Sequence, residues 1–347
     1  MPKQKQTALV ICPGRGTYNK DELGYLQRYH ADKLHILDAI DTERVINKQI
    51  SVRELDSMKS YNMRQHTAGE NAASLIYACS KADFMSINRE AFDIVGVTGN
   101  SMGWYIALAV AGALSEQNAA KLINTMGSMM AGGTIGGQSI YPIVDEQWKV
   151  SAELVEQVQN ALMTVNQTPD AELYESIRLG GYMVFGGNEK ALKMLDTLLP
   201  KLEDRYPMRL FNHAAFHTPM LDAIAVKARQ VLPASLFSAP ELPLIDGTGK
   251  IWQPYSTDVT QLHDYTLGTQ VNCTYDFTKA IEVSIKEFAP DKLIVLGPGA
   301  TLGGAIAQTL IMHNWQDLKD KADFIARQKA DPFLLAMGME KQRDFVL

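Results

Sequence analysis

The sequence predicts an α/β protein with one large lobe and one smaller inserted unit. Short apolar runs that stop at glycine or proline recur far apart, at Thr7 to Cys12, Phe92 to Thr98 and Lys292 to Leu296, and are typical of buried strands. Between them, the middle of the chain follows a different order of strands and helices. The length of 347 residues also exceeds the usual size of a single domain.

The large lobe is expected to alternate strands and helices. In chain order, the pattern predicts a strand at 7–12, helical sequence over 20–65, a helix at 71–80, a strand at 92–98, a tight turn at 99–103, a helix at 104–113, a strand at 242–245, a helix at 277–287 and a strand at 292–296. The helix at 104–113 is apolar nearly all round, which indicates central burial. About the last thirty residues are charged and helically spaced, so we expect a tail on the surface.

The middle of the chain predicts a second, smaller unit. Its elements are a strand at 140–144, a helix at 152–164, strands at 174–178 and 182–185, a helix at 189–199 and a strand at 208–211. This βαββαβ order is typical of a ferredoxin-like unit. We therefore predict a small subdomain at 137–212, inserted into a discontinuous large domain formed by 1–136 and 213–347.

Composition and charge narrow the possible partners. The net charge is −6, with no run of five like charges, so we expect neither nucleic acid nor a membrane surface as a partner. No window approaches the roughly 20 apolar residues that span a bilayer, and the short apolar run near the start does not predict a signal peptide. Cys12, Cys79 and Cys273 are few and far apart, so we expect reduced, buried thiols in a cytoplasmic protein.

A G-x-S-x-G motif lies between an apolar strand and a helix, as Gly99-Asn-Ser-Met-Gly103. Glycines on both sides of Ser101 allow a strained turn that presents the hydroxyl at the start of the helix. There the helix dipole and free N–H groups favour the oxyanion that forms when a serine attacks a carbonyl. The alternative is a glycine-rich junction without chemistry.

A serine nucleophile needs a base, because its hydroxyl is barely ionised at neutral pH. Of the seven histidines, His213 and His217 stand in FNHAAFHTPM, after a strand and before a helix that begins near a proline. A loop there can reach the edge of the sheet, so this pair supplies the candidate bases.

Four separated blocks give the chain a family resemblance. VICPGRGTY at Val10, VTGNSMGWYIALAVAGAL at Val97, AAFHTPML at Ala214 and LGPGATLGG at Leu296 resemble motifs of the malonyl-CoA:acyl-carrier-protein transacylases, which load carrier proteins in fatty-acid and polyketide synthesis. The resemblance implies an α/β-hydrolase-like large domain with a mainly parallel sheet. It also implies a ping-pong acyl transfer from coenzyme A to an acyl carrier protein, by a monomer without metal or redox cofactor.

The resemblance also assigns roles to residues. It implies that Ser101 is the nucleophile and His217 the general base, oriented by the backbone carbonyl of Gln270. The oxyanion hole is expected to consist of the backbone N–H groups of Arg15 and Met102.

The departures from the family pattern concern substrate recognition. Met126 stands where the family has the arginine that binds the malonyl carboxylate, and a thioether cannot pair with a carboxylate. Asn100 and Glu70 also replace family residues near the substrate. Arg178 or Arg15 is a candidate for a displaced carboxylate anchor.

Three functions therefore compete. The first is acyl transfer, nominally of malonyl but open to another acyl group. The second is an acyl-thioester hydrolase, in which water resolves the acyl-enzyme. The third is a catalytically weak homologue that serves as a binding partner in a synthase assembly.

Overall fold

The computed structural model describes residues 5–347, and its large lobe is built on a six-stranded sheet. The strand order is β11-β10-β1-β2-β7-β8, and every neighbouring pair is parallel except β7 with β8. The strands are β1 (Gln6–Cys12), β2 (Phe92–Gly99), β7 (Leu244–Ile245), β8 (Ile251–Trp252), β10 (Lys292–Val295) and β11 (Leu334–Ala336). The predicted α/β class is confirmed.

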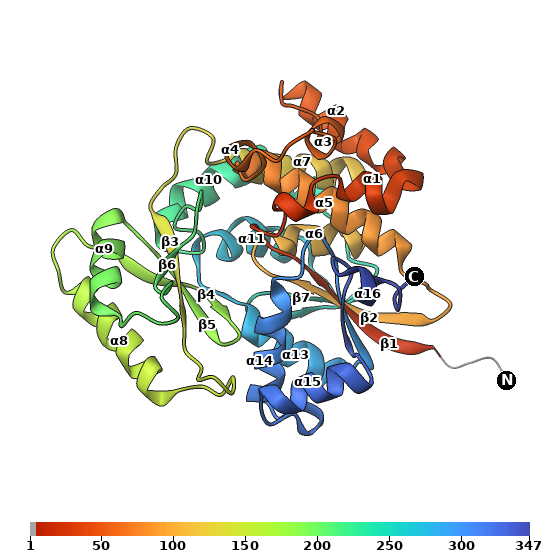
Figure 1. Cartoon of the computed structure of the whole chain (residues 1–347). Helices are drawn as coiled ribbons and strands as arrows, with labels where there is room; N and C mark the ends of the chain where they lie inside the picture. Colours follow the sequence, from red (N-terminus) through yellow and green to blue (C-terminus); the bar gives the residue numbers. More distant parts are fainter. Residues whose placement is uncertain (1–4) are drawn as a thin grey trace.

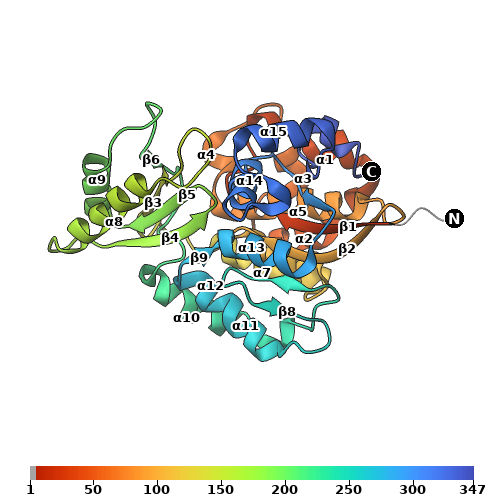
Figure 2. The ribbon, with the colours of Figure 1, turned by 90° about the horizontal axis from the view of Figure 1, so that it is seen from below.

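Helices cover both faces of this sheet (Figure 1). On the upper side in Figure 1 lie α1 (Tyr25–His30), α2 (Leu37–Ile46), α3 (Val52–Asp56), α4 (Met63–His66), α5 (Gly69–Ser86), α6 (Gly103–Val110) and α7 (Glu116–Ser128). Below it lie α13 (Phe277–Phe288), α14 (Leu302–Met312) and α15 (Lys321–Ala330). Figure 2 shows α10 (Asp222–Val231), α11 (Val259–Leu267) and α12 (Thr269–Asn272) grouped near β8.

The small lobe has its own sheet and its own apolar core. Its chain order is β3 (Gly137–Pro142), α8 (Ala152–Asn166), β4 (Leu173–Leu179), β5 (Tyr182–Gly187), α9 (Glu189–Leu198) and β6 (Met208–Arg209). These four strands pair antiparallel in the order β6-β3-β5-β4. A fifth strand, β9 (Tyr275–Asp276), comes from beyond residue 212 and pairs parallel with β4. The two lobes therefore share a segment, and the subdomain boundaries stay a prediction.

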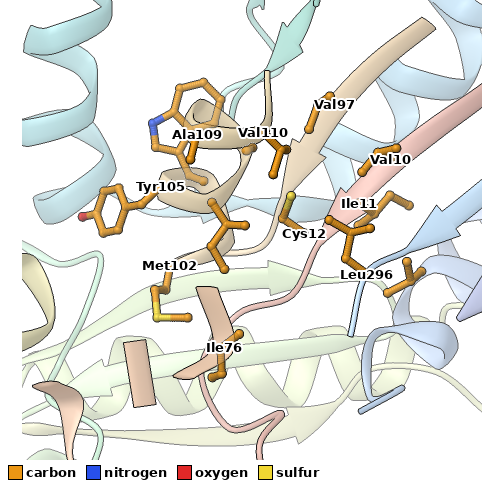
Figure 3. Close-up of a cluster of buried hydrophobic side chains, with 14 of the residues drawn as sticks. Val10, Ile11, Cys12, Ile76, Val97, Met102, Tyr105, Ala109, Val110 and Leu296 are labelled. Atoms are coloured by element: carbon orange, nitrogen blue, oxygen red, sulfur yellow. The ribbon is translucent and has the colours of Figure 1, made fainter. Parts of the chain in front are cut away.

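Part of the core of the large lobe lies beside the start of α6, next to the turn that carries Ser101, and Figure 3 shows Met102 and Tyr105 within it. Every residue of α6 is buried, as its apolar sequence predicts. Cys12 and Val97 come to this core from β1 and β2, Ile76 comes from α5, and all three are fully buried. The loop after β2 therefore packs against buried side chains of β1, β2 and α5.

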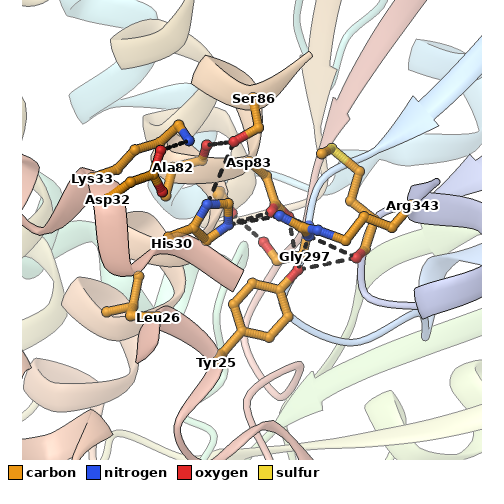
Figure 4. Close-up of polar contacts among 12 residues, drawn as sticks. Tyr25, Leu26, His30, Asp32, Lys33, Ala82, Asp83, Ser86, Gly297 and Arg343 are labelled. Atoms are coloured by element: carbon orange, nitrogen blue, oxygen red, sulfur yellow. Dashed lines mark hydrogen bonds and ion pairs between the residues drawn. The ribbon is translucent and has the colours of Figure 1, made fainter. Parts of the chain in front are cut away.

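The prediction of a surface tail at the C-terminus is wrong. After α15, residues 333–337 are buried, and β11 within them extends the large sheet beside β10. The short α16 (Glu340–Arg343) follows, and its Arg343 is buried against Asp83 (Figure 4). The charged helical pattern on either side obscured the apolar run FLLAM, which is too short to show a period.

Two further findings concern cysteines and membranes. Cys12 and Cys79 are buried as predicted, but Cys273 is exposed, because it follows α12 at the surface and not within a core element. Among residues 5–347, no helix combines the length and apolarity needed to cross a bilayer.

Candidate active site

Ser101 sits at a sharp turn between β2 and α6. Its φ is 55°, a left-handed conformation that non-glycine residues adopt only at strained positions. Gly103 makes the turn possible, because a Cβ added there would lie 2.3 Å from the Cys12 carbonyl oxygen. A Cβ at Gly99 would lie equally close to the Gly103 carbonyl group, at 2.3 Å. The glycines of the motif are therefore required by close backbone packing.

His217 reaches Ser101 from the loop before α10. The Ser101 Oγ and His217 Nε2 atoms are 2.7 Å apart. On the other side of the ring, Nδ1 donates to the backbone carbonyl of Gln270 at 2.6 Å. A carbonyl only accepts, so this bond places the proton on Nδ1 and leaves Nε2 free to accept the serine proton. Of the two candidate bases, the structure brings His217 to the serine.

Burial sets the charge of this histidine. It lowers the pKa of His217 to about 4, although the hydrogen bond to Gln270 acts in the opposite direction. The imidazole is therefore neutral at pH 7. A neutral imidazole next to a hydroxyl is what general-base chemistry requires.

Hydrogen bonds that the sequence did not predict hold Gln270 and the turn together. The Tyr105 hydroxyl donates to Gln270 Oε1 at 2.6 Å, and Gln270 Nε2 donates to the Ser101 carbonyl at 3.0 Å. The Tyr275 hydroxyl donates to the Gly99 carbonyl at 2.6 Å. One signal for Tyr105 was present, because a tyrosine within an apolar buried helix needs a polar partner.

The expected oxyanion donors lie at the same place. Arg15 and Met102 line one cavity together with Ser101 and His217. Within residues 5–347, neither backbone N–H donates a hydrogen bond to another protein group. Both are thus available to an oxyanion, and their role stays a prediction.

The cavity next to Ser101 is small and mostly apolar. Its volume is about 70 Å³. Besides the residues above, its wall includes Met126, Met129, Met130, Leu221, Ile224 and Val271. Met126 therefore lies at the candidate acyl site, where its thioether adds apolar surface.

The structure does not bring Arg178 to this cavity. Its Nη2 lies 2.8 Å from Glu175 Oε2, its Nη1 lies 3.2 Å from Asp276 Oδ2, and its side chain is 53% exposed. It lines a separate surface cleft. Strand β4 directs this side chain to the surface, where the charge of Arg178 is already paired with two carboxylates. A role as carboxylate anchor is therefore not supported.

The other two recognition candidates also lie outside the cavity wall. Glu70 is in the first turn of α5, where its backbone carbonyl accepts from Arg44. Asn100 is 8% exposed, and its Oδ1 has no hydrogen-bond partner within the described residues.

Arg15, in contrast, lines the cavity of Ser101, and it also lines a neighbouring surface cleft. Its Nη2 donates to the Thr67 carbonyl at 3.1 Å, and its guanidinium lies 5.3 Å from the ring centroid of Phe216. His213 lies nearby but contacts Gln138 Oε1 through Nδ1 at 2.7 Å. Burial, with Arg15 and His217 adding to it, lowers the pKa of His213 to about 3.

Comparisons with known proteins identify relatives of this architecture. No protein-family model matches the chain. The chain is 24% identical to the malonyl CoA-acyl carrier protein transacylase of Bacillus subtilis over 224 residues, which is 62% of this chain and 67% of that protein. It is also 24% identical to the polyketide biosynthesis protein PksE of the same organism over 307 residues, which is 85% of this chain but only 36% of the longer protein.

Solved structures agree with the sequence relatives. The malonyl-CoA:ACP transacylase of Synechocystis superposes with a TM-score of 0.74 at 17% identity, covering 98% of this chain and 99% of that one. The fold defines an α/β protein of the transacylase type, and Ser101 and His217 are in contact at its cavity. More narrowly, its fold is that of the malonyl-CoA:acyl-carrier-protein transacylases, and the resemblance predicted from four sequence blocks is confirmed.

Proposed function

We propose that the protein is an acyltransferase that moves a short acyl group, nominally malonyl, from coenzyme A to an acyl carrier protein. The observation that carries this proposal is the chain of contacts from Ser101 Oγ through the His217 ring to the Gln270 carbonyl. The names of the similar proteins support the choice of donor and acceptor. We further propose that it acts as a cytoplasmic monomer, without metal or redox cofactor.

The first half-reaction forms an acyl-enzyme. Ser101 Oγ attacks the thioester carbonyl while His217 Nε2 takes the hydroxyl proton. The resulting oxyanion faces the N–H groups of Arg15 and Met102. When the tetrahedral intermediate collapses, the C–S bond breaks and the imidazolium returns its proton to the leaving sulfur, so coenzyme A departs as a thiol.

The second half-reaction repeats these steps with the carrier thiol. His217 takes the thiol proton, the sulfur attacks the Ser101 ester, and the same proton then returns to the serine oxygen as the ester bond breaks. The dyad is thus restored, and no other reactant is consumed.

A hydrolase remains the second candidate, because Met126 leaves the usual anchoring position without a charge. In that case water replaces the carrier thiol in the second half-reaction. The neutral base beside Ser101 argues against the third function, a catalytically weak binding partner.

Intact-mass measurement separates these functions. The protein is mixed with a panel of acyl-CoAs, the mass increase on Ser101 is measured, and carrier protein is then added. Transfer of the acyl group supports the proposal, and its loss to water at the same rate with or without carrier supports the hydrolase. If no donor produces an adduct that Ser101→Ala abolishes, both catalytic functions are wrong.

A further inference from the structure

Arg15 places a positive charge in an otherwise apolar reaction cavity. The side chain is partly buried and lines the same small cavity as Ser101 and His217. It comes from the loop after β1, whereas Met126 comes from α7. The charge thus reaches the cavity from a different element than the family pattern suggests.

The fold makes room for the guanidinium. A Cβ added to Gly69 would lie 3.2 Å from Arg15 Nη2 and 2.6 Å from the Gly127 carbonyl oxygen. A side chain at Gly69 would therefore displace the guanidinium and push apart α5 and α7. On the other side the Phe216 ring offers its face, a favourable contact for a cation.

The charge has no counter-ion within residues 5–347. Arg15 forms no ion pair with any carboxylate of the described residues, and the hydrogen bond of its side chain goes to the Thr67 carbonyl. Burial lowers the pKa of Arg15 to about 10, so the group remains protonated at neutral pH. A guanidinium carries five N–H donors, and this one bond leaves others free for a ligand in the cavity or for solvent in the neighbouring cleft.

The size of the cavity limits that ligand. Its volume is about 70 Å³, roughly half of the ~150 Å³ of a cavity that takes up benzene. A group of about three or four heavy atoms therefore fits within it. A methylene group with a carboxylate has four, and a carboxylate is the group that an arginine pairs with in a bidentate manner.

We propose that Arg15 binds a carboxylate at the far end of the acyl group, so that the donors are short dicarboxylic acyl thioesters. This inference rests on the proposed function. It assigns two roles to one residue, because the backbone N–H of Arg15 faces the oxyanion while its side chain faces the carboxylate. Acyl chain and reacting carbonyl are then positioned by the same loop.

The test compares malonyl-CoA with 3-methylbutanoyl-CoA, whose isopropyl group has the shape of a carboxylate but no charge. The measured quantity is the ratio of the two second-order rate constants for Ser101 acylation. We expect the wild type to favour malonyl, and Arg15→Gln, which keeps the backbone N–H, to lower the ratio about 100-fold or more. Arg15→Lys, which keeps a charge but loses the bidentate fork, should give an intermediate ratio.

Arg178→Gln is the matched control, since it removes an arginine that lies outside the cavity. Its ratio and rates should equal those of the wild type. A wild type that prefers 3-methylbutanoyl-CoA, or an Arg15→Gln variant that lowers both rates equally, overturns the inference while the proposed function stands. Absence of acylation by every donor overturns the proposed function itself. If Arg15→Gln does not fold, Arg15→Lys decides, because an unchanged ratio in that variant also overturns the inference.

Discussion

Arg343, close to the end of the chain, completes a buried polar cluster whose disruption should be measurable (Figure 4). Its Nη1 lies 2.7 Å from Asp83 Oδ1 and donates to the Tyr25 hydroxyl oxygen at 3.1 Å and the Met337 carbonyl at 3.0 Å. Asp83 is fully buried, and its Oδ2 accepts from Tyr25 and from the Gly297 N–H. The cluster joins the C-terminus to α5 and to the loop after β10.

Arg343→Met should lower the free energy of unfolding by about 3–5 kcal/mol, because it removes the guanidinium from a buried carboxylate whose Oδ1 then keeps only His30 Nε2, at 2.7 Å. The remaining donors of Asp83 favour the lower end of that range. Asp83→Asn combined with Arg343→Met should be less destabilising than the sum of the single changes, by about 1 kcal/mol or more, since the two side chains contact each other.

Urea unfolding monitored by circular dichroism measures these values. Lys341→Met is the matched control, because Lys341 is exposed on the same short helix, and it should change stability by less than about 0.5 kcal/mol. A loss below about 1 kcal/mol for Arg343→Met, or strict additivity in the double variant, would refute the reasoning.

Three further predictions concern the site. His217 must be neutral to act as a base, and burial lowers its pKa to about 4. The Ser101 acylation rate should therefore rise with pH through about 4 and be flat near neutrality. A midpoint of the rate near pH 6.5 would contradict this. Tyr105→Phe removes the hydroxyl bound to Gln270 and should cost about 1–3 kcal/mol of stability and slow acylation several-fold; an unchanged rate would show that Gln270 needs no such support. Gly103→Ala should destabilise by about 2 kcal/mol or more, whereas Gly303→Ala in α14, with open space at its Cβ, should be neutral or stabilising; equal unfolding midpoints would argue against the close packing of the turn.

The sequence predicted those parts of the fold that have local patterns. Apolar runs bounded by glycine gave β1, β2 and β10 within a residue or two, and the all-apolar α6 was correctly expected in the core. Among the shortest strands, the pattern indicated β6 and β7 but missed three others. β8, β9 and β11 have two or three residues each, and only their pairing partners make them strands.

The candidate site shows the same division. The turn at Ser101 has a local signature, because its glycines are demanded by nearby backbone. Arg15 and Arg178 are equivalent in sequence terms, and only the structure separates a charge aimed into the cavity from one paired with Glu175 and Asp276. The Tyr105 and Tyr275 hydroxyl groups bind Gln270 and Gly99, which lie far away along the chain. A local sequence pattern can indicate that such a hydroxyl needs a partner, but it cannot identify the partner.

The segment 269–276 has a consequence for how substrates are admitted. The backbone carbonyl of Gln270 within it accepts from His217 Nδ1, and five residues later β9 joins the sheet of the small lobe through Tyr275 opposite Ile177. A hinge rotation between the lobes would break this pairing and pull the Gln270 carbonyl away from His217. Conformational change on binding is therefore expected to be confined to side chains at the cavity mouth. Under the proposed function, selection among acyl groups then depends on the preformed shape and charge of the cavity.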